Sequence, residues 1–177
     1  MFTRKGDSGE TDNPSTGRVS KGDMVVEIEG ELDSLISLIG YASTIVKWPD
    51  IVSDLGQTQV DLFTIGEDIL AGGKKRTLGE ERTSWLEERT LVYRKEVGKI
   101  RLFVVPGGSE ESAVLHVART WARTTERLVV RYSDTVHTSK HIFSYLNRLS
   151  SLFFMQALAA NVRKGISERI WDIGRES

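Results

Sequence analysis

Three arginines in the second half of the chain are spaced so that they could bind an anion. Arg119, Arg123 and Arg127 recur every four residues, so on a helix their guanidinium groups lie along one side. Like charges at this spacing repel each other by roughly a few tenths of a kcal/mol per pair unless an anion lies between them, and Glu126 relieves part of this repulsion. The planar fork of arginine suits carboxylate and phosphate oxygens. The pattern therefore fits either an anion site or a solvated helix face with one ion pair.

The sequence has few other residues of a catalytic or metal-binding type. His137 and His141 are four residues apart and could share a metal ion. No HExxH motif or Glu-x-x-His pair accompanies them, so we expect capping or surface roles for these residues and for His116. A Ser-His-Asp triad cannot be recognised from spacing, because triads form in space. Asn147 lies among leucines at core spacing, and it either faces water or hydrogen bonds to a ligand.

Composition narrows the class of protein further. The 177-residue chain has 24 basic and 25 acidic side chains and a net charge of −1, so general attraction to nucleic acid or acidic membranes is not expected. It has no cysteine, which removes disulfides, thiolate metal sites and cysteine nucleophiles. It has neither an apolar signal region nor a run of about 20 apolar residues that would span a bilayer. We therefore expect one cytoplasmic domain without membrane or nucleic-acid partners.

The arginine row must be positioned by a helix, and apolar residues recur at helical spacing through most of the chain. Pro49 suits the first turn of a helix, and Ser109 suits a helix N-terminus. Residues 24–30 alternate loosely and could form a short strand. The predicted helices cover residues 31–46, about 49–71, 77 or 79 to 97, about 110–132 and about 135–164.

These helices predict an all-α fold, a five-helix bundle with ferritin-like up-and-down packing. In the third helix, Arg82 and Arg89 belong to a charged face that is expected to be solvated. Residues 3–21, before the first helix, are polar and contain a single aliphatic side chain, Val19. Such a composition has little apolar surface to bury, so by itself it favours a disordered tail over a loop that holds a ligand.

Six short motifs occur in order over residues 3–150: TRKGDSGET, GRVSK, VEIEGELD, FVVPGGS, LHVARTWARTTER and YLNRLS. In this order they resemble the PduO-type ATP:cob(I)alamin adenosyltransferases. The resemblance implies a homotrimer in which ATP and a corrinoid bind between subunits. It divides the chain into an N-terminal nucleotide-binding loop, residues 1–23, and a single helical-bundle domain, residues 24–177.

The resemblance also implies a reaction. The 5'-deoxyadenosyl group of ATP is transferred to Co(I) of a corrinoid, giving adenosylcobalamin and triphosphate, with Mg²⁺ assisting. Since Co(I) is the nucleophile at the ribose C5', the protein supplies positioning and electrostatic stabilisation and needs no nucleophile of its own. A reductase and a cobalamin-dependent enzyme are further possible partners.

The matching motifs imply roles for particular residues. Arg119 would pair across the subunit boundary with Asp33, and together with Arg123 these form the implied catalytic set. Phe103 would lie against the corrinoid and help displace its lower axial ligand, which makes Co(II) easier to reduce. No protein side chain is implied as a metal ligand. The implied ATP-binding residues are Thr3, Arg4, Gly6, Asp7, Gly9, Thr11, Lys21, Arg123, Glu126 and Asn147.

The chain departs from the family pattern at several positions. Thr124 stands where an arginine is usual, Ser151 replaces an acid, and Ser34 and Ile36 occupy positions that are normally polar. Residues 12–17 also differ from the usual Gly-rich sequence, and we expect disorder there. Two alternatives to an active transferase follow. One is a related trimer that binds ATP or corrinoid as a carrier or regulator, and the other is a generic helical interaction protein.

Overall fold

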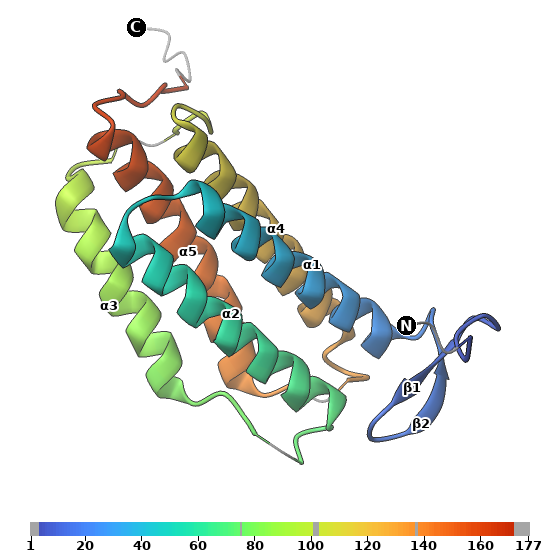
Figure 1. The fold of residues 1–177 in the computed structure, drawn as a ribbon. Helices are drawn as coiled ribbons and strands as arrows, with labels where there is room; N and C mark the ends of the chain where they lie inside the picture. Colours follow the sequence, from blue (N-terminus) through green and yellow to red (C-terminus); the bar gives the residue numbers. More distant parts are fainter. Residues whose placement is uncertain (1–3, 75, 101–102, 137, 172–177) are drawn as a thin grey trace, which may run out of the picture.

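The chain folds into five long helices preceded by a small hairpin. The computed structural model describes residues 4–74, 76–100, 103–136 and 138–171. Successive helices run in opposite directions, and the hairpin lies at one end of the bundle beside the start of the first helix (Figure 1). The elements are β1 (Glu10–Asn13), β2 (Gly17–Ser20), α1 (Met24–Ile45), α2 (Pro49–Leu70), α3 (Glu80–Val97), α4 (Glu110–Tyr132) and α5 (Lys140–Arg163). The prediction of an all-α fold with five helices is confirmed.

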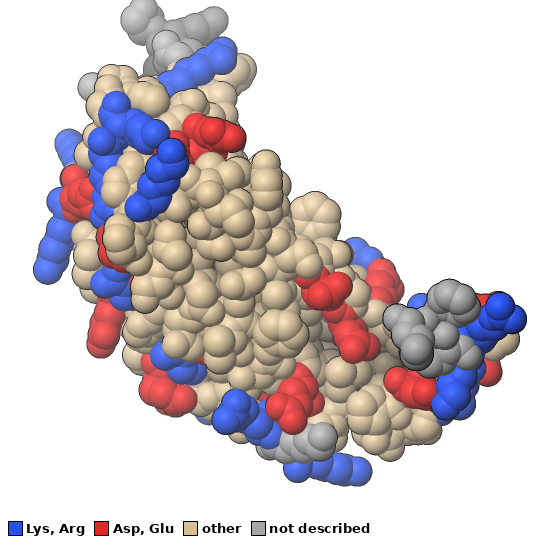
Figure 2. Space-filling model, viewed as in Figure 1, with Lys and Arg blue, Asp and Glu red and all other residues tan. Residues whose placement is uncertain are grey.

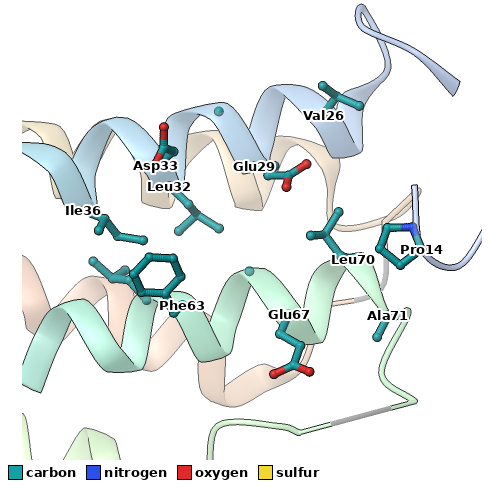
Figure 3. A pocket seen from close by; sticks show the side chains of 13 residues that line it. Pro14, Val26, Glu29, Leu32, Asp33, Ile36, Phe63, Glu67, Leu70 and Ala71 are labelled. Atoms are coloured by element: carbon teal, nitrogen blue, oxygen red, sulfur yellow. The ribbon is translucent and has the colours of Figure 1, made fainter. Parts of the chain in front are cut away.

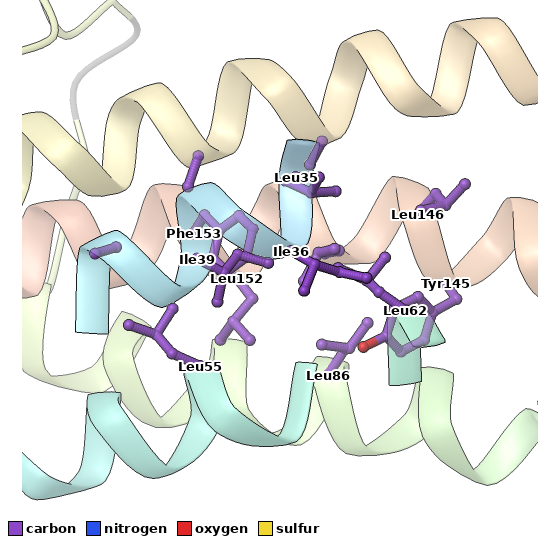
Figure 4. Close-up of a cluster of buried hydrophobic side chains, with 14 of the residues drawn as sticks. Leu35, Ile36, Ile39, Leu55, Leu62, Leu86, Tyr145, Leu146, Leu152 and Phe153 are labelled. Carbon is purple, nitrogen blue, oxygen red and sulfur yellow. The ribbon is translucent and has the colours of Figure 1, made fainter. Parts of the chain in front are cut away.

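One hydrophobic core joins all five helices. α1 packs against α2 and α4, α4 packs against α5, and α5 packs against α3. Leu35, Leu62, Leu86 and Phe153 come from four different helices and lie together in this core (Figure 4). Ala122 of α4 is fully buried as well. Each large buried side chain contributes about 2 kcal/mol, so the core holds α4 and α5, which carry Arg123 and Asn147, in a fixed frame.

The first helix begins earlier than its sequence predicted. α1 starts at Met24, and the side chain of Asp23 accepts a hydrogen bond from the backbone N–H of Val25. Ile28 is fully buried and continues the helical spacing of Leu32. The suggested strand over residues 24–30 was therefore wrong, because a helix cap and one buried isoleucine outweigh the loose alternation of that segment.

The last helix begins later than predicted. α5 starts at Lys140 rather than near residue 135, and Ser139 accepts a hydrogen bond from the backbone N–H of His141. This serine cap ends the preceding loop and fixes the direction of α5.

The N-terminal segment is an antiparallel hairpin. Glu10 pairs with Ser20, and the register continues to the turn at residues 14–16. Asn13 stabilises this turn, since its Oδ1 accepts hydrogen bonds from the N–H and hydroxyl of Ser15, both at 2.8 Å. The expectation of disorder in residues 12–17 was wrong, because Asn13 and cross-strand hydrogen bonds replace the hydrophobic burial that the composition lacks.

Two buried carboxylates of α2 are neutralised by two arginines of α3. Asp54 accepts a hydrogen bond from Arg89 Nε at 2.8 Å and another from the hydroxyl of Tyr93 at 2.6 Å. Asp61 lies two turns further along α2 and accepts a hydrogen bond from Arg82 Nη2 at 2.8 Å. The solvated face predicted for Arg82 and Arg89 was wrong, because both arginines turn toward the acidic groups of the neighbouring helix.

In the described part of the chain, no helix has both the length and the apolar character of a membrane span.

We predict that Asp54→Asn lowers the free energy of unfolding by about 2 kcal/mol, because it leaves Arg89 partly buried without a negative partner. Urea denaturation followed by circular dichroism measures this change. Glu88→Gln, on the exposed side of the same α3, is the control and should shift the free energy by less than about 0.5 kcal/mol. Equal urea midpoints for Asp54→Asn and wild type would show that the pair does not stabilise the fold.

Candidate functional site

A positively charged cavity lies between α3, α4 and α5. It has a volume of about 390 Å³, and three arginines line it: Arg119 and Arg123 of α4 and Arg94 of α3. Three guanidinium groups around one cavity can bind a polyanion. The remaining lining residues are Thr90, Ile100, Ser150, Ser151, Phe154 and Met155.

Arg119 is held in this cavity by a histidine and an aromatic ring. Its Nε–H donates to His116 Nδ1 at 3.4 Å, and its guanidinium carbon lies 6.0 Å from the centre of the Phe154 ring. Burial lowers the pKa of Arg119, and the neighbouring charge of Arg123 lowers it further. Arg119 therefore lies in an environment where a bound anion would be stabilised.

His116 itself is buried, with 3% of its surface exposed. Burial, followed by the charge of Arg119, lowers the pKa of His116 to about 4, so the imidazole is neutral near pH 7. The predicted capping or surface role was wrong for this residue, because the ring faces the interior of the bundle. His141 lies in the first turn of α5, and His137 lies outside the described residues.

Asn147 and Glu126 meet at the surface between α4 and α5. Asn147 Nδ2 donates to Glu126 Oε1 at 2.9 Å, and Asn147 Oδ1 accepts from Arg148 at 2.7 Å. Asn147 is one helical turn from Ser150, and Glu126 is one turn from Arg123, so both adjoin the arginine cavity. The sequence-predicted pair is thus brought together within a single chain.

The residues predicted to wrap a phosphate chain lie in and before the hairpin, at its N-terminal end. Lys21 Nζ donates to the carbonyl oxygen of Gly6 at 2.9 Å, and the Lys21 backbone N–H donates to Gly9 at 2.8 Å. Gly9 has a φ of +80°, a conformation that favours glycine. Asp7 and Thr11 belong to the same segment, as does Arg4. Thr3 lies outside the described residues.

Asp33 lies in a different cavity from Arg119. This groove, of about 530 Å³, runs between α1 and α2, where Phe63 points from α2 toward Leu32 of α1 (Figure 3). Ile36, one of the departures from the family pattern, also lines it. Phe63 is 65% exposed, and the central α1–α2 face carries few charges (Figure 2). The implied pairing of Asp33 with Arg119 would therefore join two copies of the chain.

Phe103 lies on the loop between α3 and α4, far from the hairpin in sequence. Its side chain is 52% exposed. Within the described residues, acidic and histidine side chains do not gather as a group that could hold a metal ion.

Comparison with known proteins decides the family. The sequence matches the family model described as cobalamin adenosyltransferase over residues 1–160. The chain belongs to the cobalamin adenosyltransferase family. The resemblance inferred from the six ordered motifs is confirmed.

Relatives of this cobalamin adenosyltransferase family match over nearly the whole chain. A corrinoid adenosyltransferase of Bacillus subtilis (strain 168) is 36% identical over 174 residues, which cover 95% of this chain and 90% of that protein. One from Citrobacter freundii is 35% identical and covers 89% of this chain and 92% of its own length.

A solved structure has the same fold. It is a variant PduO-type ATP:corrinoid adenosyltransferase from Lactobacillus reuteri complexed with cobalamin and ATP. It has a TM-score of 0.90 and 29% identity, and the match covers 98% of this chain and 97% of that one.

The sequence alone did not identify Arg94, Thr90 or the buried His116 as parts of the candidate site. Arg94 lies on α3, a helix with many charged residues whose other arginines pair with α2. Its charge alone therefore did not mark Arg94 as a ligand-binding residue. His116 precedes Arg119 by three residues, a spacing that places both on one helical face. That spacing was the available signal for a contact between them.

We predict that His116 makes stability pH-dependent. Because its pKa is about 4 in the folded chain and near 6.5 when unfolded, its contribution is complete above about pH 6.5 and is lost as pH falls toward 4. Between pH 7 and 5, wild type should lose roughly 1 to 2 kcal/mol more unfolding free energy than His116→Asn. Urea titrations at both pH values measure this difference, and parallel losses in the two proteins would contradict it.

Proposed function

We propose that this chain transfers the 5'-deoxyadenosyl group of ATP to Co(I) of a corrinoid. The electron pair of Co(I) forms the cobalt–carbon bond at C5', while the C5'–O bond breaks and its electrons leave with triphosphate. Adenosylcobalamin and triphosphate are the products. Membership of the cobalamin adenosyltransferase family over residues 1–160 supports this reaction.

The observation that carries the proposal is the cavity with Arg94, Arg119 and Arg123. Negative charge develops on triphosphate as the C5'–O bond breaks, and fixed guanidinium groups stabilise it without reorganisation. The same charges repel one another, so binding of a polyanion between them also relieves their repulsion. Mg²⁺ bound to the phosphate oxygens would supply further positive charge.

The rest of the nucleotide would be held by Asn147 and Glu126, which adjoin this cavity, and by the N-terminal loop. Asn147 offers an amide donor and acceptor, and Glu126 offers a carboxylate, which together suit a nucleoside with hydroxyl and amino groups. The N-terminal loop, residues 1–23, would wrap the triphosphate, with Lys21 exchanging its bond to Gly6 for a phosphate oxygen. Its other phosphate-contacting residues would be Thr3, Arg4, Gly6, Asp7, Gly9 and Thr11.

Assembly as a homotrimer would bring these groups together. Asp33 and Arg119 line separate cavities of one chain, so a salt bridge between them requires neighbouring copies. The exposed Phe63, Val60 and Tyr41 make the face that contains Asp33 suitable for burial against another subunit. The helical-bundle domain, residues 24–177, would thus form both the interface and the walls of the active site.

The corrinoid would lie against Phe103, whose half-exposed ring would help to displace the lower axial ligand. A reductase would then supply the electron that converts Co(II) to Co(I), and a cobalamin-dependent enzyme would receive the product.

A carrier or regulator that binds ATP or corrinoid without efficient transfer is the second candidate. It is favoured by Ser151, which lines the arginine cavity where the family usually has an acid, and by Thr124, whose hydroxyl accepts from Arg127 at 3.0 Å. Anaerobic incubation with ATP, Mg²⁺ and chemically reduced cobalamin separates the two functions. A spectral change to the adenosyl form supports the transferase, and tight ATP binding without product supports the carrier.

We predict that Arg123→Ala lowers turnover at least about a hundredfold, because a donor to the leaving triphosphate is lost. The helical circular dichroism should be unchanged, since the side chain is exposed. Arg131→Ala, in the last turn of the same helix, is the control and should retain wild-type turnover. Wild-type activity in Arg123→Ala would rule out this arginine as a phosphate ligand.

We predict that Asp33→Arg prevents trimer formation, because it places a positive charge opposite Arg119 of the neighbouring copy. Sizing chromatography with light scattering measures the assembly. Adding Arg119→Asp should restore it by reversing both charges, whereas Glu29→Gln in the same groove should leave assembly unchanged. A trimeric Asp33→Arg variant, or no restoration in the double variant, would count against the pairing.

A further inference from the structure

The chain beyond α5 folds back onto the loop that carries Phe103. Residues 166–171, called the C-terminal strap below, run antiparallel to this loop, with a bridge between Val104 and Ile170. The Trp171 N–H donates to the carbonyl oxygen of Phe103 at 2.8 Å, and the Val105 N–H donates to Arg169 at 2.7 Å. The backbone of Phe103 is therefore held directly by the C-terminal strap.

One buried amide connects the strap, the loop and the ends of two helices. Asn161, in the last turn of α5, is 1% exposed. Its Nδ2 donates to the carbonyl oxygen of Gly107 at 2.9 Å and to Glu168 Oε1 of the strap at 3.0 Å. Its Oδ1 accepts from the backbone N–H of Ser109, the N-cap of α4, at 2.8 Å. All three hydrogen bonds converge on a single side chain.

The loop is shaped to admit this amide. Gly108 has a φ of +100°, and a Cβ atom at this position would overlap the side-chain amide of Asn161. Burial raises the pKa of Glu168, and the hydrogen bond from Asn161 offsets part of that effect. Asn161 thus contacts both a glycine that has no room for a side chain and the partly buried carboxyl group of Glu168.

The strap also lines a cavity next to Val104, the residue that follows Phe103. This cavity has a volume of about 610 Å³, and Ile166 and Ile170 of the strap line it together with Val104 of the loop and Leu158 of α5. The Trp171 ring, at the end of the strap, is 62% exposed. Movement of the strap would therefore alter both the backbone of Phe103 and the shape of the adjoining cavity.

We propose that Asn161 and Glu168 are positioning residues that fasten the C-terminal strap to the loop and thereby fix the Phe103 ring against the corrinoid. This inference rests on the proposed function, which gives Phe103 its contact with the corrinoid. The loop contains two consecutive glycines, Gly107 and Gly108, so without the strap the Phe103 ring would sample many positions. A misplacement of about 1 Å is costly in catalysis. The hydrogen bonds of Asn161 to Glu168 and to Gly107, called the clasp below, remove that freedom before the corrinoid binds.

The test compares Glu168→Ala, which removes the carboxylate acceptor, with Glu168→Gln, which keeps an oxygen for Asn161. The affinity for cob(II)alamin in the presence of ATP should fall about tenfold in Glu168→Ala and recover in Glu168→Gln. The optical and electron-paramagnetic signature of base-off Co(II) should weaken in parallel, while ATP affinity stays within about twofold. Ser167→Ala, in the same strap, is the matched control and should behave as wild type.

Hydrogen exchange provides a readout that does not depend on activity. The Val105 and Trp171 amides should exchange faster in Glu168→Ala than in Glu168→Gln. Wild-type corrinoid affinity and Co(II) signature in Glu168→Ala would overturn the inference, whether or not exchange changes. Failure of the wild-type protein to form adenosylcobalamin would instead overturn the proposed function, and the cob(II)alamin affinities would still decide the role of the clasp.

Discussion

The bundle depends on how two of the buried carboxylates of α2, those of Asp54 and Asp61, are paired. Asp54 and Asp61 are almost fully enclosed, and an unpaired charge in that position costs several kcal/mol. Arg89 and Arg82 satisfy them from α3, each assisted by a tyrosine hydroxyl, Tyr93 for Asp54 and Tyr145 for Asp61. Because the partners are seven residues apart on both helices, α3 can satisfy them in only one register. That register also fixes where the remaining side chains of α3 point.

The site follows from this register. With α3 fixed against α2 and α5, Arg94 lies at the cavity that Arg119 and Arg123 line from α4. The cavity therefore combines groups from helices that are far apart in sequence, and its walls are continuous with the hydrophobic core. Asp33 lies outside it, in the groove between α1 and α2. The chain thus carries an arginine cavity in one place and an acidic group in another, an arrangement that would suit the proposed homotrimer.

The sequence could predict much of the fold, because Pro49 and Ser109 mark the N-termini of two helices and apolar spacing identifies all five. It could not predict that Arg82 and Arg89 are partly buried, since their acidic partners lie on another helix and look like ordinary surface residues. The start of α1 depends on Asp23, whose capping role requires its backbone geometry. The six motifs predicted the family, and the roles that they imply for individual residues stay predictions. They could not predict which of these residues share a cavity within one chain, because that is set by tertiary packing.

The hydrogen bond from Arg119 to His116 distinguishes this arginine from Arg82 and Arg89, which pair with carboxylates. Arg82 and Arg89 face carboxylates, so their charges are cancelled and contribute little to the field outside the core. Arg119 is oriented by an imidazole that is neutral near pH 7, since the pKa of His116 is about 4. A neutral acceptor directs a guanidinium without cancelling it. Arg119 therefore keeps a full unit of charge in a partly dehydrated place, where the local potential acts on an incoming anion over a longer range than in water.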